Sequence, residues 1–156
     1  PGGLLVVGNA PTGLYFEDFE AGRIWETAAR TIGEADVTAF AGLTGDYTYL
    51  HTDAEAASKS PFGDRIAHGL LGLSYLSGLI TRLGILEGTV EAFMGVEMRF
   101  RKPIMFDDTV HAKVEVKMTR LTNKGQGLVT LGIKLMNQNE ETVQEGEFVL
   151  MVARKE

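Results

Sequence analysis

Asp46 and His51 are the residues whose types and spacing best fit chemistry in this sequence. They lie five positions apart within the stretch Gly42–Ala57. A carboxylate and an imidazole can hold one water between them and exchange protons near neutral pH, which is what general acid–base catalysis requires. Helix neighbours are three or four residues apart, so a shared helix face does not join this pair. We therefore expect a loop to bring the two side chains together.

The same residues also have a purely structural interpretation. Gly45-Asp46 is a common turn pair, and the stretch from His51 to Ala57 is typical of a helix start, capped by Thr52 or Asp53. The residues by themselves leave the catalytic and the structural interpretation open.

The other two histidines have simpler interpretations. His111 shares a strand face with Lys113 and Glu115, which predicts a solvent-facing side chain. His68 falls in the first turn of a predicted helix, where capping or packing is the ordinary role.

Metal and nucleophile chemistry find little support in the sequence. Asp46, His51, Asp53 and His68 could supply nitrogen and oxygen ligands, but their spacing matches no known ligand motif such as His-Glu-x-x-His. No Gly-x-Ser-x-Gly elbow and no phosphate-binding glycine motif is present. We therefore expect no metal site and no serine nucleophile.

Composition indicates one globular domain. The chain has 156 residues, of which 44% are hydrophobic and 23% charged. Its net charge of −6 argues against nucleic-acid binding, and the absence of cysteine fits a reducing compartment, so we expect a cytoplasmic protein. Residues 1–13 show no basic leader, and their apolar run Leu4–Val7 is too short for a secretory signal.

Hydrophobic periodicity predicts the elements that must position these residues. We expect a loose lead-in over residues 1–16 and a single domain over 17–156. A strand is predicted within 23–32, and a short helix over 34–44 that ends near Gly45. Residues 66–81 carry no charge and predict a buried helix, too short and too rich in glycine and serine to span a membrane.

The second half of the chain alternates between apolar and polar residues. This period of two predicts strands within 96–103, 109–118, 128–137 and 142–155, joined as antiparallel hairpins by turns at 123–125 and 137–141. The uncharged helix is the natural cover for the apolar face of such a sheet. The predicted class is therefore α+β, with a curved antiparallel sheet wrapped around a long central helix, as in the hotdog fold.

Two motifs carry a resemblance to a known family. The chain resembles the MaoC-like dehydratases, also called (R)-specific enoyl-CoA hydratases or hydratase 2, in FAGLTGDYTYLHTDAEAA (40–57), DRIAHGLLGLSYLSGL (64–79) and RFRKPIMFDDTVHAKVEV (99–116). The family motif Gly-Asp-x-Asn-Pro-hydrophobic-His is matched at Gly45, Asp46, Leu50 and His51. The Ala-His-Gly entry to the central helix is matched at 67–69. Elements from about residue 18 onward follow the family's order.

The resemblance implies a function and a set of site residues. Asp46 and His51 would be the acid–base pair of a hydratase that adds water to a 2-enoyl thioester. The amide N–H of Gly69 would bind the thioester oxygen, and Ser77 would orient the imidazole. An acyl-CoA substrate, no metal or redox cofactor, and a homodimer with its sites at the subunit interface are implied as well.

The sequence departs from the family motif at one place, where Thr48-Tyr49 replaces Asn-Pro. The change removes an amide and a fixed φ angle. It leaves two alternatives open: a hotdog thioesterase, and a non-catalytic protein that binds acyl thioesters. Which of Asp46 and His51 is the base, the acyl chain length, and the choice between CoA and acyl carrier protein also stay open.

A cluster of basic residues could offset the negative charge of CoA. Its members are Lys59, Arg65, Arg99, Arg101 and Lys102. The alternation of the strand that carries three of them favours a solvated strand edge instead, so we assign no CoA site to them.

Overall fold

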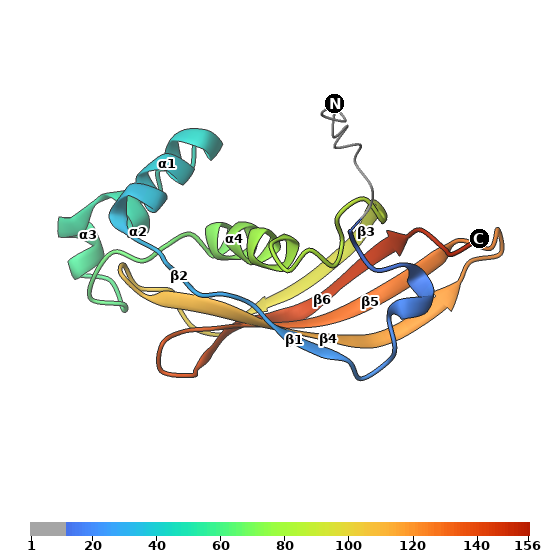
Figure 1. Cartoon of the computed structure of the whole chain (residues 1–156). Helices are drawn as coiled ribbons and strands as arrows, with labels where there is room; N and C mark the ends of the chain where they lie inside the picture. Colours follow the sequence, from blue (N-terminus) through green and yellow to red (C-terminus); the bar gives the residue numbers. More distant parts are fainter. Residues whose placement is uncertain (1–11) are drawn as a thin grey trace, which may run out of the picture.

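The computed structural model describes residues 12–156 as one antiparallel sheet with a helix, α4, lying along one of its faces (Figure 1). The spatial order of the strands is β1-β4-β5-β6-β3, and β2 also pairs with β4. The strands are β1 (Ile24–Glu26), β2 (Arg30–Thr31), β3 (Val90–Phe100), β4 (Thr109–Leu121), β5 (Gly127–Met136) and β6 (Thr142–Val152). The helices are a 3₁₀ turn η1 (Phe16–Asp18), α1 (Glu34–Thr44), α2 (Tyr49–Thr52), α3 (Ala54–Ser58) and α4 (Gly69–Thr81).

The core lies between α4 and the sheet. Leu71, Leu76 and Ile80 of α4 are almost fully buried, and they join one apolar cluster with alternating residues of β4, β5 and β6. Because burial of apolar area is the main stabilising term, an uncharged helix is most stable in this central position. The arrangement confirms the predicted hotdog fold.

The central helix begins three residues later than the sequence predicts. Ile66 forms a β-bridge with Met105, and the Ala67 amide donates to the Ile104 carbonyl, so the chain is extended until His68. His68 has φ −58° and ψ 136° and is the N-cap residue of α4, not a member of its first turn. Ile66 and Ala67 are therefore buried because they pair with the chain that enters β4, not because they belong to the helix.

The single strand predicted within 23–32 is also wrong, because two short strands occur there. Thr27 separates the two strands. Its amide donates to the Ala112 carbonyl, as in a regular ladder. The Ala112 amide, however, donates to the Thr27 hydroxyl instead of the Thr27 carbonyl. A side chain thus replaces a backbone group in the ladder. Threonine competes with the backbone in this way, and periodicity does not reveal it.

Strand β3 forms one edge of the sheet and is longer than predicted, beginning at Val90 instead of near 96. Met98 packs against the core, but most of the other apolar side chains of β3 are not covered by residues 12–156. The exposed fractions are 55% for Phe93, 52% for Met94, 52% for Val96 and 52% for Phe100. This open apolar edge is the main part of the surface that does not fit a solvated monomer.

The predicted lead-in, residues 1–16, falls largely outside the described residues. The same holds for residues 1–13, in which no secretory signal is predicted. Residues 13–16 lie within the structure and are bonded to the domain. The amides of Gly13, Leu14 and Phe16 donate to the carbonyls of Glu87, Ile85 and Ala153. Among the described helices, none is both long and apolar enough to cross a membrane.

A polar cluster fastens α1 to α4. The Tyr75 hydroxyl donates to Asp36 Oδ1 at 2.7 Å, Arg30 pairs with the same carboxylate at 3.1 Å, and the Arg30 guanidinium stacks over the Tyr75 ring. Burial raises the pKa of Asp36, but the bonds from Tyr75, the Gly33 amide and Arg30 outweigh it, so the pKa is lowered. The cluster fixes the helix that precedes Asp46.

We predict that Tyr75→Phe lowers the free energy of unfolding by about 1 kcal/mol at neutral pH, the usual value of one hydrogen bond. Since the bond favours the ionised form of Asp36, the difference should be present above the unfolded pKa of an aspartate and shrink as the pH falls below it. Urea unfolding at neutral and acidic pH measures both. Tyr49→Phe, which removes a hydroxyl from a half-exposed ring, is the control. An equal loss in the two variants would contradict the role of the cluster.

Candidate active site

A left-handed residue at the end of α1 sets the position of Asp46. Gly45 has φ +78° and donates its amide to the Ala41 carbonyl, which ends the helix in the manner common for glycine. The Asp46 amide then donates to the Thr44 hydroxyl at 3.1 Å. The chain therefore reverses direction and projects the Asp46 side chain away from α1.

Thr48 holds the carboxylate of Asp46. Its hydroxyl donates to Oδ1 at 2.6 Å, and its amide donates to the same oxygen at 3.1 Å. These two bonds lower the pKa of Asp46, burial opposes them, and the imidazoles of His51 and His68 lower it further. Asp46 is therefore an ionised acceptor at neutral pH, with Oδ2 left for a further partner.

His51 lies in α2, a single turn that the sequence analysis did not predict. Its Nδ1 is 2.8 Å from the Ile66 carbonyl. Because a carbonyl only accepts, Nδ1 carries the proton and the other ring nitrogen, Nε2, is a bare acceptor in the neutral ring. Of the two caps considered for the following helix, Asp53 is the one observed: it accepts from the Ala56 amide at 3.0 Å and starts α3.

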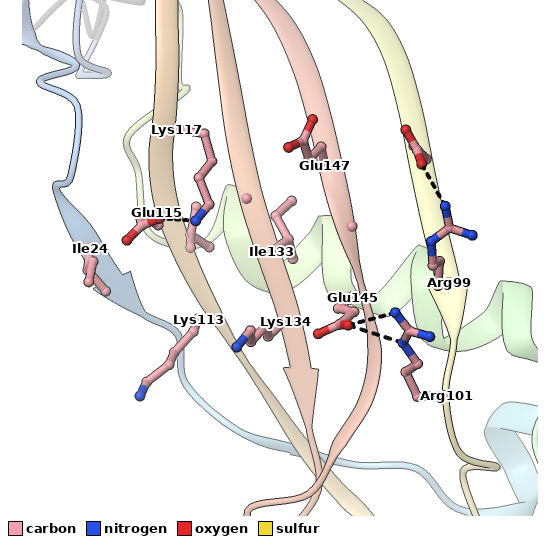
Figure 2. A pocket seen from close by; sticks show the side chains of 14 residues that line it. Ile24, Arg99, Arg101, Lys113, Glu115, Lys117, Ile133, Lys134, Glu145 and Glu147 are labelled. Carbon is pink, nitrogen blue, oxygen red and sulfur yellow. Dashed lines mark hydrogen bonds and ion pairs between the residues drawn. The ribbon is translucent and has the colours of Figure 1, made fainter.

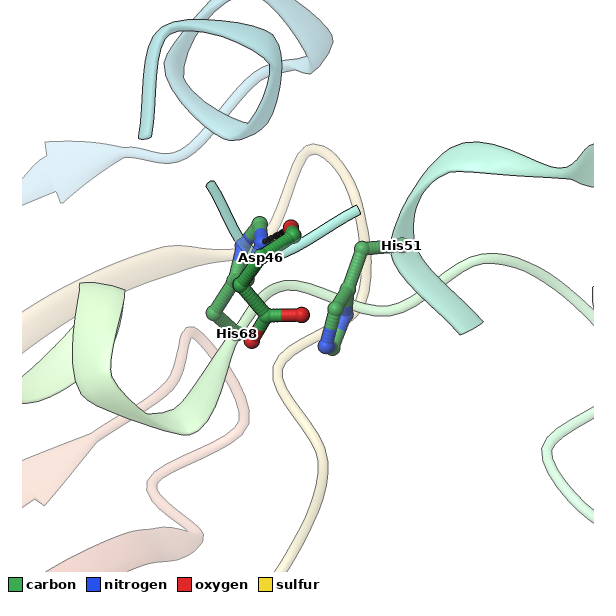
Figure 3. Close-up of side chains that lie close together, drawn as sticks. All are labelled: Asp46, His51 and His68. Carbon is green, nitrogen blue, oxygen red and sulfur yellow. Dashed lines mark hydrogen bonds between the residues drawn. The ribbon is translucent and has the colours of Figure 1, made fainter. Parts of the chain in front are cut away.

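Asp46, His51 and His68 converge on one small space (Figure 3). One potential ligand atom from each lies within 4.8 Å of the other two. A water makes hydrogen bonds of about 2.8 Å, so a single water can reach both Asp46 and His51. The loop thus brings the predicted pair together.

His68 links this pair to the central helix. It is only 2% exposed, its Nε2–H donates to the Asp46 carbonyl at 2.9 Å, and its ring stacks on that of His51 at 3.9 Å between centroids. Phe40 packs edge-on against its other side. Capping or packing is the role that the sequence predicts for His68. The sequence does not predict the bond to Asp46, although the Ala-His-Gly motif already marks this residue.

The cluster has the donor types that transition metals bind, but two of its ring nitrogens already have other partners. Nδ1 of His51 and Nε2 of His68 already donate to carbonyls. His51 Nε2, His68 Nδ1 and Oδ2 of Asp46 are the atoms that remain for a water or an ion. The arrangement is therefore suited to moving protons.

Gly69 presents a backbone donor next to the cluster. It is the first residue of α4 and is exposed, and within residues 12–156 its amide N–H has no acceptor. A Cβ at this position would lie 3.0 Å from the Phe100 ring, so a larger residue would press on that ring. The free N–H and the positive end of the helix dipole fit a developing negative charge on an oxygen.

A groove of about 280 Å³ adjoins the Gly69 amide. Its walls are mainly apolar and aromatic, with two basic residues at the rim: Phe62, Ile66, Ala67, Gly69, Phe100, Arg101, Lys102, Pro103, Ile104 and Gln144. An acyl or pantetheine chain has the dimensions and the polarity for such a groove.

Ser77 is not brought to the pair in this chain. Its hydroxyl is exposed and donates to the Ser74 carbonyl at 2.7 Å, two turns along α4 from Gly69. The imidazole of His51 is oriented by the Ile66 carbonyl instead.

Four of the five basic residues considered for CoA are already in ion pairs. Arg65 pairs with Glu34, Arg99 with Glu97, Arg101 with Glu145 and Lys102 with Glu141. Two of these pairs lie in a groove of about 500 Å³ across the face of the sheet turned away from α4 (Figure 2). Acidic and basic side chains alternate there, which fits the solvated surface expected from the sequence. His111 lies on β4 and is half-buried, not fully solvent-facing.

Comparison with known proteins agrees with this geometry. The family model described as MaoC like domain matches residues 18–139, which include Asp46, His51, His68 and Gly69. The chain belongs to the MaoC-like dehydratase family. This assignment confirms the resemblance seen in the sequence motifs.

Proteins similar to this chain are named as dehydratases and hydratases. The chain is 36% identical over 146 residues to a 3-hydroxybutyryl-CoA dehydratase of Methylorubrum extorquens, covering 92% of this chain and 87% of that protein. It is 32% identical over 122 residues to an (R)-specific enoyl-CoA hydratase of Aeromonas caviae, covering 78% and 87%. Among solved structures, one described as a monoamine oxidase regulatory protein from Archaeoglobus fulgius has a TM-score of 0.87 and 34% identity, covering 92% and 97%.

The departure from the family motif at Thr48-Tyr49 leaves the loop intact. Thr48 supplies two donors to Asp46 where the motif has asparagine. Tyr49 is the first residue of α2, the helix position at which proline is best tolerated but not required. The exchange therefore alters the loop surface more than its path.

We predict that Thr48→Val raises the pKa of Asp46, because the largest of the bonds that lower it is lost. A carboxyl titration followed by NMR measures this in the absence of any substrate. Thr52→Val is the matched control, since the Thr52 hydroxyl donates to the Tyr47 and Thr48 carbonyls and not to the carboxylate. An unchanged Asp46 titration in Thr48→Val would show that the hydroxyl does not hold the carboxylate.

Proposed function

We propose that this protein reversibly adds water to a trans-2-enoyl thioester of coenzyme A and forms the (3R)-3-hydroxyacyl thioester. The observation that carries this proposal is the convergence of Asp46 and His51 beside the free amide of Gly69. The family membership and the names of the relatives support the same reaction.

The acid–base pair accounts for the proton movements. A water held by Asp46 and Nε2 of His51 adds its oxygen to C3, while one of its protons passes to the pair and the pair delivers a proton to C2. The net change is the addition of one water, so the reaction needs no redox cofactor. Dehydration is the same path in reverse.

The Gly69 amide accounts for activation of the double bond. Attack at C3 moves negative charge to the thioester oxygen, and a preorganised N–H at a helix start stabilises that charge. Gly69 directly follows His68, which contacts both members of the pair. The donor and the acid–base pair are thus neighbours, as a reaction at C3 next to the thioester carbonyl requires.

A hotdog thioesterase would use the same fold but attack the carbonyl carbon. A single assay separates the two reactions: incubation with an enoyl-CoA and with its saturated analogue. Loss of the enoyl absorbance without release of free thiol supports hydration, and thiol release from the saturated substrate supports hydrolysis. Binding with no turnover at any chain length would support a non-catalytic acyl-thioester binding protein.

We predict that Asp46→Asn and His51→Gln each lower the hydration rate by ~10²–10⁴-fold, the usual contribution of a positioned acid or base. Both substitutions keep the size of the side chain, so circular dichroism and the melting temperature should change little. Asp53→Asn is the control, because its carboxylate caps α3 outside the cluster. Near-normal turnover in either of the first two variants would remove that residue from the mechanism.

We further propose that the protein works as a homodimer that pairs through β3. This edge strand has no neighbour on its outer side in residues 12–156, and it exposes Phe93, Met94 and Val96. Phe100, at its end, packs on Gly69, so this edge borders the site. Pairing of two such edges would cover the apolar side chains and enclose the groove.

We predict that Val96→Lys shifts the protein from dimer to monomer in sedimentation experiments and lowers turnover at least tenfold. A lysine at an exposed edge adds a charge that opposes strand pairing. Met118→Lys, at a 53% exposed position of the inner strand β4, is the matched control and should stay dimeric. A wild-type protein that sediments as a monomer while fully active would contradict the dimer.

A further inference from the structure

Gln144 of β6 is a buried polar residue that the proposed mechanism does not use. Its side chain is 1% exposed, and its Nε2 donates to the Gly69 carbonyl at 2.9 Å. Since a carbonyl only accepts, this contact also fixes which end of the amide faces Gly69. The residue bonded here is the one whose N–H the proposed function assigns to the thioester oxygen.

The other end of the same amide has no partner. Within the described part of the chain, Oε1 of Gln144 is buried without a hydrogen bond. A buried acceptor without a partner destabilises a protein, whereas an apolar side chain of similar length in the same place would not. The bond from Nε2 and the unpartnered Oε1 change the stability in opposite directions, so stability alone does not favour a glutamine over an apolar side chain at this position.

The neighbouring residues are arranged around this amide. A Cβ on Gly72 would lie 2.5 Å from Gln144 Nε2 and 2.6 Å from the Ile104 side chain, so only a glycine leaves room for the contact. Phe100, which is the cross-strand partner of Gln144 on β3, lies against the other side of Gly69. Two adjacent strands thus hold Gly69 from two directions.

We propose that Gln144 is a positioning residue that holds the Gly69 backbone so that its N–H points at the thioester oxygen. This inference rests on the proposed function. A glycine has no side chain to fix its own orientation and has the widest choice of backbone angles. Gln144 fixes the Gly69 carbonyl, and the Phe100 ring lies where a Cβ of Gly69 would be. The Gly69 N–H is then the backbone group that remains for the substrate.

The test is Gln144→Met, which keeps the length of the side chain and removes the donor. We expect kcat for hydration to fall about tenfold, because a misaligned donor loses part of its effect on the transition state. KM should change less than kcat, since Gln144 is 1% exposed and offers the groove only a small part of its surface. The melting temperature should stay the same or rise, because the unpartnered Oε1 is removed as well.

A vibrational measurement reports on the amide directly. In an Asp46→Asn background, which prevents turnover, the carbonyl stretch of bound enoyl-CoA, labelled at the carbonyl carbon, should shift to lower frequency than in solution. Adding Gln144→Met should return it toward the solution value. A role limited to packing would not move this frequency.

Thr89→Val is the matched control. Thr89 is 1% exposed, and its hydroxyl is also buried without a partner in the described residues. It lies before β3, at the opposite end of that strand from Phe100. This variant should leave kcat and the carbonyl frequency unchanged.

The outcomes separate this inference from the proposed function. If the wild-type protein turns over no enoyl-CoA, the proposed function fails. If it does, but Gln144→Met keeps the wild-type kcat and carbonyl frequency, the positioning role fails alone. Loss of activity in step with a lower melting temperature, with the frequency unchanged, would assign Gln144 to packing and overturn the inference.

Discussion

The bond from His68 to the Asp46 carbonyl is the contact on which the site depends. It joins a loop after α1 to the start of α4, two segments separated by 22 residues. The same ring supports His51 by stacking, so one buried side chain places both the acid and the imidazole. Without it, Asp46 would be held only by contacts within its own loop.

The rest of the fold keeps that ring in place. α4 is fixed by apolar burial against the sheet, and α1 is fixed to α4 by Tyr75, Asp36 and Arg30. His68 then lies between Phe40 of α1 and His51 of α2. The precision of the site therefore comes from the packing of three helices, even though its polar groups lie on a loop and two helix starts.

Much of this architecture could be predicted from the sequence because burial leaves a periodic trace. Alternation identified β4, β5 and β6, and the lack of charge identified α4, since both patterns follow directly from which face is buried. Asp46, His51 and Gly69 were predicted through the family motifs. Residue types alone had left Asp46 and His51 open between a catalytic and a structural role.

What could not be predicted depends on contacts between distant residues. The start of α4 moves to Gly69 because Ile66 pairs with Met105, and the first strand divides because the Thr27 hydroxyl takes a backbone position opposite Ala112. The exposure of β3 was hidden because Val96 and Phe100 have the alternation of buried residues. A surface that a partner covers and a core have the same sequence pattern.

The placement of Gln144 late in the chain has a consequence for how the protein matures. α4 leaves the ribosome well before β6, so the helix that carries Gly69 exists for a time without the strand that fastens its first residue. Because such long-range strand pairing is the slow part of folding, the contact between Gln144 and Gly69 is among the last to form. In a nascent chain, or in one shortened before β6, Gly69 would therefore lack the bond that fixes its carbonyl.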